Sequence, residues 1–191
     1  TTLKENLLLR NDGNQFTEVA RQAGVAGKAV WSTASIFVDI DQDGFLDLFV
    51  GNYVKWSKKI DRNIFCSLDG ENDNYCHPDL YEGEQGVFYY NNGDGTFSEQ
   101  TKERGFTGRG DSAPLKTLGI ASTDFDKNGY PDLVLANDMQ PDLLFQNKGN
   151  GTFQEVGTVA GIAYNRKGQP RAGMGIVIGD LNNSGYESIV V

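Results

Sequence analysis

A pair of alternating segments occurs three times along the chain, and this repetition limits the possible folds more than any other feature. The first segment contains an apolar strand, an Asn/Gly turn, a Phe and a polar strand, in "NLLLRNDGNQFTEVARQAGV", "GVFYYNNGDGTFSEQTKERGF" and "DLLFQNKGNGTFQEVGTVAGI". The second places an acidic loop between two strands, in "ASIFVDIDQDGFLDLFVGN", "GIASTDFDKNGYPDLVLAN" and "GIVIGDLNNSGYESIVV". Each segment is typical of a β-hairpin, so two hairpins in succession predict a four-stranded antiparallel unit, the blade of a β-propeller.

The spacing of the repeats supports a unit of constant length. The interval from Phe97 to Phe153 equals the interval from Asp124 to Asp180, although the two pairs belong to different hairpins. The interval from Asp39 to Asp124 is longer than this repeat length. A single insertion between the second and third strands of one blade accounts for the surplus.

The repeats divide the chain into four consecutive parts. Residues 1–24 are expected to form the second half of a blade, and residues 25–107 a full blade that carries the insertion in the region 53–86. Residues 108–163 are expected to form another full blade, and residues 164–191 the first half of a further one. The predicted fold is therefore all-β, with about three blade-equivalents of a larger propeller. Because propellers typically have roughly 4 to 8 blades, the other blades are expected from a longer chain or from another chain.

Composition agrees with short strands and argues against two classes of partner. The 191 residues include 24 glycines and 38% hydrophobic residues, which suits strands joined by turns better than a helical bundle. A net charge of -9 gives little reason to expect a nucleic-acid partner. No window approaches 18 apolar residues, so no membrane span is expected, and the first residues contain no signal peptide.

Two of the acidic loops place oxygen-bearing groups at the same alternate positions of a pattern D-x-D-x-D-G-x-x-D. In the first loop these groups are the side chains of Asp39, Asp41, Asp43 and Asp47 and the carbonyl of Phe45. In the second loop they are the side chains of Asp124, Asp126, Asn128 and Asp132 and the carbonyl of Tyr130. Calcium takes about 6 to 8 oxygen ligands, and the glycine permits a sharp bend, so we predict two calcium sites.

Two other interpretations of these loops are an EF-hand and a simple acidic turn. An EF-hand needs a glutamate at the twelfth position, where this sequence has Val50 and Leu135, and strands rather than helices flank both loops. The acidic turn remains the alternative, because Asp, Asn and Gly favour turns. The recurrence of all the liganding positions at identical spacing favours the calcium site.

The third loop has a weaker version of the pattern. Asp180, Asn182 and Ser184 occupy the first three liganding positions, but Ser188 replaces the last carboxylate. Because affinity for calcium depends on the number of charged ligands, weak binding or none is expected here.

The insertion contains both cysteines of the chain. We predict a disulfide between Cys66 and Cys76, since a long polar segment would otherwise lose much entropy on ordering. Two unpaired buried cysteines are the alternative. His77 has no partner residues for haem or zinc and is expected to form a local hydrogen bond beside Pro78.

A short "GRGDS" segment lies in the loop that enters the second full blade, on the same face as the insertion. Arg109, Gly110 and Asp111 form the tripeptide of an integrin-recognition motif. A chance occurrence is the favoured interpretation and integrin recognition the alternative, since so short a motif carries little specificity.

The loops resemble the FG-GAP or VCBS repeats of integrin α-subunit propellers. The phrases "NNGDGTFSE", "GNGTFQEV", "DLVLANDMQPDLLFQN" and "GQPRAGMG" are similar to proteins of the ASPIC and UnbV group, related to cartilage acidic protein. This resemblance covers nearly the whole chain. It implies a seven- or eight-bladed calcium-bound propeller that is exported, whether to the periplasm, the cell surface or the extracellular space, and it implies no established activity.

The topology of a blade separates two candidate faces. The acidic loops join first to second strands, whereas the insertion joins a second to a third strand, so the two are expected at opposite ends. We therefore expect calcium to be structural and the insertion face to bind a protein or glycan partner, with a role in adhesion and with no catalytic residues. The alternative is part of a propeller enzyme, a lyase or hydrolase that acts on polysaccharide.

Overall fold

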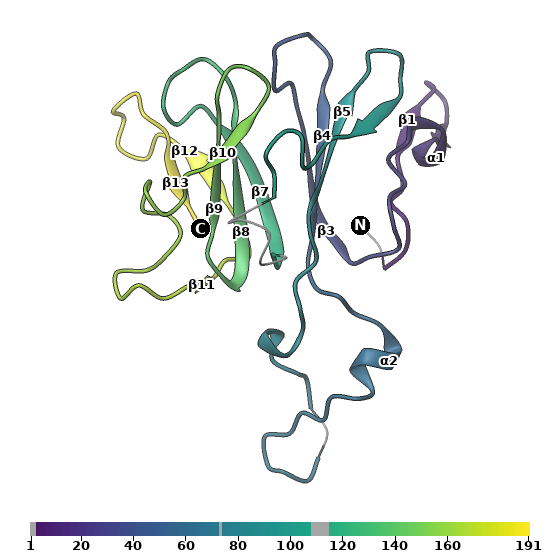
Figure 1. Cartoon of the computed structure of the whole chain (residues 1–191), viewed down its shortest axis with the longest axis vertical. Coiled ribbons are helices and arrows are strands. Elements are labelled where there is room, and N and C mark those ends of the chain that lie inside the picture. The colour runs from purple at the N-terminus through teal and green to yellow at the C-terminus, as the bar shows by residue number, and fades with distance from the viewer. Residues whose placement is uncertain (1–2, 73, 108–114) are drawn as a thin grey trace.

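The computed structural model describes residues 3–72, 74–107 and 115–191, and these residues form antiparallel β-sheets with very little helix (Figure 1). Two of the sheets contain four consecutive strands each. The first has the order β3 (Ser32–Val38), β4 (Asp47–Asn52), β5 (Val87–Asn91) and β6 (Phe97–Glu99). The second has the order β7 (Thr117–Thr123), β8 (Asp132–Gln140), β9 (Leu143–Asn147) and β10 (Phe153–Glu155). The predicted all-β fold with four-stranded antiparallel blades is confirmed, in an open rather than a closed arrangement.

Two hairpins flank these sheets. At the N-terminal side β1 (Leu9–Asn11) pairs with β2 (Phe16–Glu18), and at the C-terminal side β12 (Val177–Gly179) pairs with β13 (Ser188–Val190). A short strand, β11 (Arg171–Ala172), also pairs with the end of β8.

The last strand of each blade is short. The Phe of each repeat begins it, and β2, β6 and β10 have three residues each. After β2 the chain forms a short helix, α1 (Ala20–Ala23), in which both alanines are buried. A helical turn buries these small apolar side chains against the neighbouring sheet, which a continued edge strand would not do.

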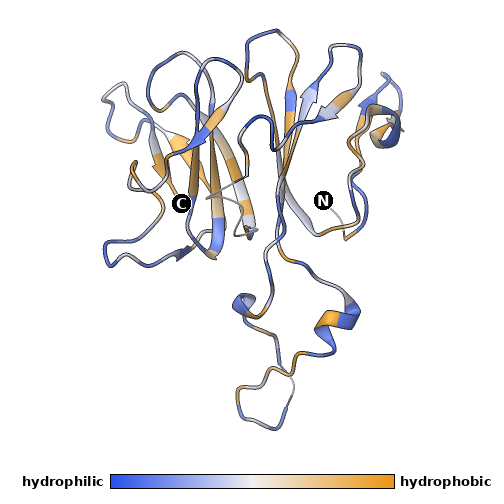
Figure 2. Ribbon diagram, in the orientation of Figure 1, coloured by the Kyte–Doolittle hydropathy of each residue, from blue (hydrophilic) through white to orange (hydrophobic). Residues whose placement is uncertain are grey.

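Apolar side chains fill the space between neighbouring sheets, where Figure 2 shows hydrophobic residues along the strands. The largest cluster contains side chains of both four-stranded sheets, among them Phe49 and Phe145, which are fully buried. Phe106 lies at its centre, and its ring centroid is 4.8 Å from that of Phe88 and 4.4 Å from that of Phe153. This aromatic cluster therefore joins one blade to the next.

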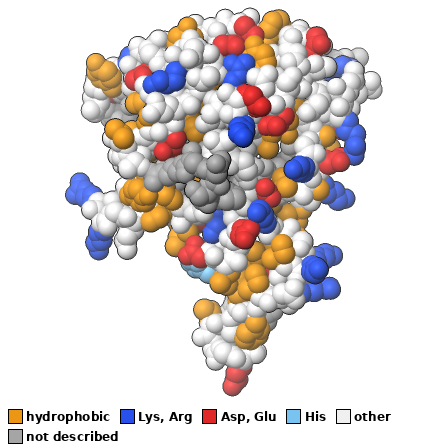
Figure 3. Space-filling view, viewed as in Figure 1, with side chains coloured by type: hydrophobic (Ala, Val, Ile, Leu, Met, Phe, Trp, Pro, Cys, Tyr) orange, Lys and Arg blue, Asp and Glu red, His pale blue; other side chains and the backbone are white. Residues whose placement is uncertain are grey.

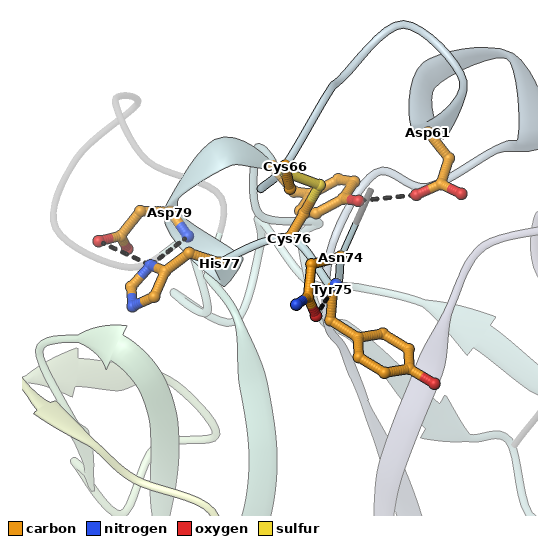
Figure 4. The surroundings of a disulfide bond; sticks show 8 residues. Asp61, Cys66, Asn74, Tyr75, Cys76, His77 and Asp79 are labelled. Carbon is orange, nitrogen blue, oxygen red and sulfur yellow. Dashed lines mark hydrogen bonds and ion pairs between the residues drawn. A yellow bond between two sulfur atoms is a disulfide. The ribbon is translucent and has the colours of Figure 1, made fainter. Parts of the chain in front are cut away.

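The insertion between β4 and β5 projects from one end of the sheets, while the loop between β3 and β4 lies at the other end (Figure 1). It contains a helix, α2 (Lys58–Asp61), and a 3-10 helix, η1 (Pro78–Leu80). The predicted disulfide is confirmed: Cys66 and Cys76 are bonded, with a Cα to Cα distance of 5.2 Å (Figure 4).

His77 forms the local hydrogen bond expected of it. Its Nδ1 accepts a bond from the backbone N–H of Asp79 at 3.4 Å, which caps the start of η1 (Figure 4).

Two contacts fix the insertion to the neighbouring blade. The buried Lys116 donates from Nζ to the carbonyl of Pro78 at 2.8 Å. At the start of the insertion, the Tyr53 hydroxyl donates to the buried carboxylate of Asp138 in β8. The base of the insertion is therefore attached to two blades.

Candidate metal centre

Three loops at one end of the sheets have the same backbone conformation. They are residues 39–47, 124–132 and 180–188, and each joins the first two strands of its unit. The fourth residue of each loop has a positive φ although it is not glycine: Gln42 (62°), Lys127 (61°) and Asn183 (59°). The sixth residue is a glycine in the left-handed region: Gly44 (88°), Gly129 (90°) and Gly185 (80°). A non-glycine residue rarely adopts such a φ, so the shared conformation reflects a specific set of loop contacts.

The first aspartate of each loop supplies these contacts. Asp39 accepts backbone hydrogen bonds from Asp43 at 3.1 Å and from Gly44 at 3.0 Å, one on each carboxylate oxygen. Asp124 accepts the equivalent bonds from the N–H groups of the fifth and sixth loop residues, both at 3.0 Å. Asp180 does the same in the third loop, and these bonds lower its pKa. This carboxylate therefore closes the turn in all three loops.

The last aspartate of the first two loops ties the loop to the third strand of its blade. Asp47 accepts a bond from Asn91 N–H at 2.8 Å, and Asp132 accepts one from Asn147 N–H at 2.7 Å. Both carboxylates are buried, and this burial raises their pKa to about 6. Ser188 pairs with Gly179 as Asp47 pairs with Val38, but it has no carboxylate to accept such a bond.

The loops bring carboxylate oxygens within 4.8 Å of one another in two clusters. The first cluster contains Asp39, Asp41 and Asp43, and the second contains Asp124, Asp126 and Asp132. Among the described residues, the first cluster does not include Asp47 and the third loop forms no cluster of this kind. The two clusters therefore share the first two positions of the pattern and differ in the third member.

One atom of the first cluster supports a role in binding a cation. Asp41 Oδ1 is buried and has no hydrogen-bond partner in the part of the chain that the structure describes. A buried charged oxygen without a partner is costly, and a metal ion would provide its missing interaction. Because all the grouped ligands are carboxylate oxygens, both clusters could hold a hard cation.

In the first two loops the side chain of the fifth residue accepts a hydrogen bond from the backbone N–H of the seventh. Asn128 Oδ1 accepts a bond from Tyr130 N–H at 2.8 Å, and Asp43 Oδ1 accepts one from Phe45 N–H at 2.8 Å. The rings of Phe45 and Tyr130 lie against glycines of the next hairpin turn. The backbone carbonyls of these two residues remain predicted ligands of the metal.

The two acidic loops also contact each other. Asn147 Nδ2 donates to the carbonyl of Ile40, 107 residues earlier, at 2.8 Å. The Gln42 side chain donates to the carbonyl of Gly129. A change in the conformation of one loop would therefore alter hydrogen bonds with the neighbouring blade.

Asn91 and Asn147 were not among the predicted site residues, although the sequence contains a signal for them. Both end the third strand of a blade immediately before its glycine turn, and the interval between them equals the repeat length. The other predicted site, Arg109, Gly110 and Asp111, lies outside the described residues.

Comparison with known proteins identifies the repeat in the C-terminal third of the chain. Residues 124–191 match the FG-GAP-like repeat family. This FG-GAP-like segment begins at the first aspartate of the second loop and ends after β13, so it contains the second and third loops. No curated protein matches the chain.

The geometry extends the FG-GAP-like pattern toward the N-terminus. The first loop lies outside the matched residues, yet it has the same two left-handed positions and the same bonds from its first aspartate as the second loop. None of the helices in the described part of the chain has the length and apolar character that crossing a bilayer requires.

Proposed function

We propose that this chain is part of a calcium-stabilised, exported β-propeller that serves as a binding scaffold. The observation that carries the proposal is the pair of carboxylate clusters, Asp39, Asp41 and Asp43 in one loop and Asp124, Asp126 and Asp132 in the next. Calcium suits these clusters because it takes about 6 to 8 oxygen ligands in flexible geometry, which carboxylates, backbone carbonyls and water together supply.

Calcium would stabilise the blades by removing a repulsion. Within each cluster three carboxylates lie close together, and like charges at such distances disfavour the folded state. A bound ion converts this repulsion into attraction and fixes the loop. Because Asn147 and Gln42 link the two loops, the stabilisation would extend across the contact between blades.

The site of a partner is proposed from the separation of the two faces. The insertion projects from the end of the sheets opposite the loop between β3 and β4 (Figure 1). A protein or glycan partner would bind there without disturbing the calcium loops. The disulfide and the FG-GAP-like repeats suggest an extracellular location, which would also supply millimolar calcium.

Thermal unfolding with and without calcium tests the proposal. Excess chelator is expected to lower the Tm, and added calcium to restore it, while magnesium at the same concentration restores less. An Asp41→Asn variant should lose a large part of the response to calcium. Asp94→Asn is a matched control, because Asp94 lies in an exposed turn outside both clusters. A Tm that does not change in excess chelator would contradict the proposal.

A further inference from the structure

A cavity of about 390 Å³ lies between the insertion, the end of β4 and the N-terminal segment. Its aromatic wall consists of Trp31, Tyr53, Trp56 and Tyr81, whereas the side chain of Tyr75 at its rim is fully exposed. Figure 3 shows hydrophobic side chains gathered along the insertion at the lower end of that view. The volume is in the range typical of small-molecule sites, roughly 300 to 1,000 Å³. Both tryptophans of the chain line this cavity.

The rings do not form a flat platform. Trp31 lies edge to face with Tyr53, at an interplanar angle of 85°, and with Trp56, at 76°. Walls that stand at steep angles enclose a compact, rounded group better than a flat one. The faces of such rings carry negative electrostatic potential, so they favour a cation at the centre.

Two phenols of the cavity, Tyr53 and Tyr81, offer acceptors rather than donors to a ligand. The Tyr53 hydroxyl already donates its proton to Asp138, and the Tyr81 hydroxyl donates to Asp61 at 2.7 Å. What these phenols still offer to a ligand is therefore lone pairs.

The charge of the cavity has the same sign. Of the side chains that line it within the described part of the chain, Asp61 alone is charged, and none is lysine or arginine. An aromatic cavity with one carboxylate and no basic group is complementary to an organic cation.

The cavity is held in shape before any ligand binds. Cys76 in its wall is fixed by the disulfide, and the neighbouring Pro78 is held by Lys116. Tyr53 is held by Asp138 in the next blade. A preformed site loses less entropy on binding than a mobile one.

We propose that this cavity binds a methylated ammonium group of a small soluble molecule, of the kind that choline carries. The inference goes beyond the proposed function, because a calcium-stabilised scaffold needs no such site. It requires the insertion to be folded, and it does not require a particular metal in the loops.

Tryptophan fluorescence provides a direct assay, since the two tryptophans of the chain are both in the wall. The 191-residue protein is titrated with choline chloride at constant ionic strength, and in parallel with 3,3-dimethyl-1-butanol, a neutral molecule of the same shape. A saturable change with choline and a much weaker one with the alcohol is expected. Equal responses to the two molecules, or no saturable response to choline, would overturn the proposal.

Variants separate charge from packing. Asp61→Asn keeps an acceptor for the Tyr81 hydroxyl and is expected to weaken choline binding by about two- to five-fold, as for a partly exposed charge contact. Glu71→Gln is the matched control, because Glu71 is an exposed acid of the insertion that does not line the cavity.

A second pair of variants tests the aromatic wall. Trp56→Phe should retain binding and Trp56→Leu should lose it, with Trp31 as the remaining reporter. Full affinity in Trp56→Leu or in Asp61→Asn would contradict the proposal. Unfolding in chelator is measured on the same samples, so that failure of choline binding with a normal response to calcium removes this inference alone.

Discussion

Replacement of Gly105 by alanine tests how closely one blade packs on the next. Gly105 has a φ of +88°, and a Cβ built on it lies less than 3.0 Å from the carbonyl oxygen of Phe153 in β10. Gly24 has the same position in the preceding unit, where a Cβ would lie 2.8 Å from the carbonyl oxygen of Phe97 in β6. The glycine thus lets the backbone of each unit touch the last strand of the following blade.

The expected cost has two parts. A left-handed φ costs an alanine about 1 to 2 kcal/mol. Moving the two backbones apart adds about 1 to 3 kcal/mol, as for overpacking in a core, because the obstacle is backbone and cannot rotate away. The hydrogen bond from Phe153 N–H to the carbonyl of Arg104, 2.8 Å long, would be strained as well. Gly105→Ala is therefore expected to lower the free energy of unfolding by about 2 to 5 kcal/mol.

Gly161 provides the matched control within the same chain. It occupies the position of Gly105 one repeat later and has a φ of +80°, but no atom of the described residues lies within 4 Å of its Cβ position. Gly161→Ala should therefore cost about 1 to 2 kcal/mol, the backbone part alone. Equilibrium urea unfolding in excess calcium gives both values. Equal losses for the two variants would refute the proposed close contact between blades.

Three further predictions concern the insertion, the contact between blades and the loops. Reduction of the Cys66–Cys76 disulfide should destabilise the insertion by about 2 to 3 kcal/mol, because the bridge no longer restricts the unfolded loop. The rate of amide hydrogen exchange should rise in the insertion alone, and an unchanged rate there would contradict this. Tyr53→Phe leaves the buried Asp138 without its phenol donor and should cost about 1.5 to 3 kcal/mol in urea unfolding; a loss below about 0.5 kcal/mol would show that the bond is unimportant. Burial raises the pKa of Asp132 to about 6, so in metal-free protein its contribution to stability falls as the pH rises from about 4 to 6. Because calcium needs the ionised carboxylate, calcium should bind about ten-fold more weakly at pH 5 than at pH 7.5. Equal calcium affinities in titrations at the two pH values would contradict this.

The architecture could be predicted from the sequence because the repeat shows both the length of a blade and the positions of its hairpin turns. Phe97 and Phe153, one repeat length apart, occupy the same position in β6 and β10. The longer interval from Asp39 to Asp124 corresponds to the long connection between β4 and β5. The disulfide was also predictable, since the two cysteines are only 10 residues apart in one long loop.

Contacts between units could not be predicted, because no local pattern encodes them. Phe106 follows a glycine in an irregular connection, and nothing in its neighbours shows that it contacts rings of two blades. The bond between Asn147 and Ile40 spans 107 residues and depends on the angle between sheets. The aromatic cavity combines Trp31, before β3, with side chains of the insertion, and such a combination exists only in the folded chain.

The short last strands show a different limit. The sequence predicted a polar strand with Phe16, but not that it ends at Glu18, before the buried Ala20 and Ala23 form a helix. Tertiary packing outweighs weak local preference in such edge segments.

Counting the calcium ions bound per chain is the sharpest test of the two proposed metal sites. Isothermal titration of metal-free protein with calcium at pH 7.5 is predicted to give two ions per chain. Asp41→Asn should abolish or greatly weaken the site in the first loop, and Asp126→Asn the site in the second. Absence of saturable calcium binding, or binding that both variants leave unchanged, would contradict the account.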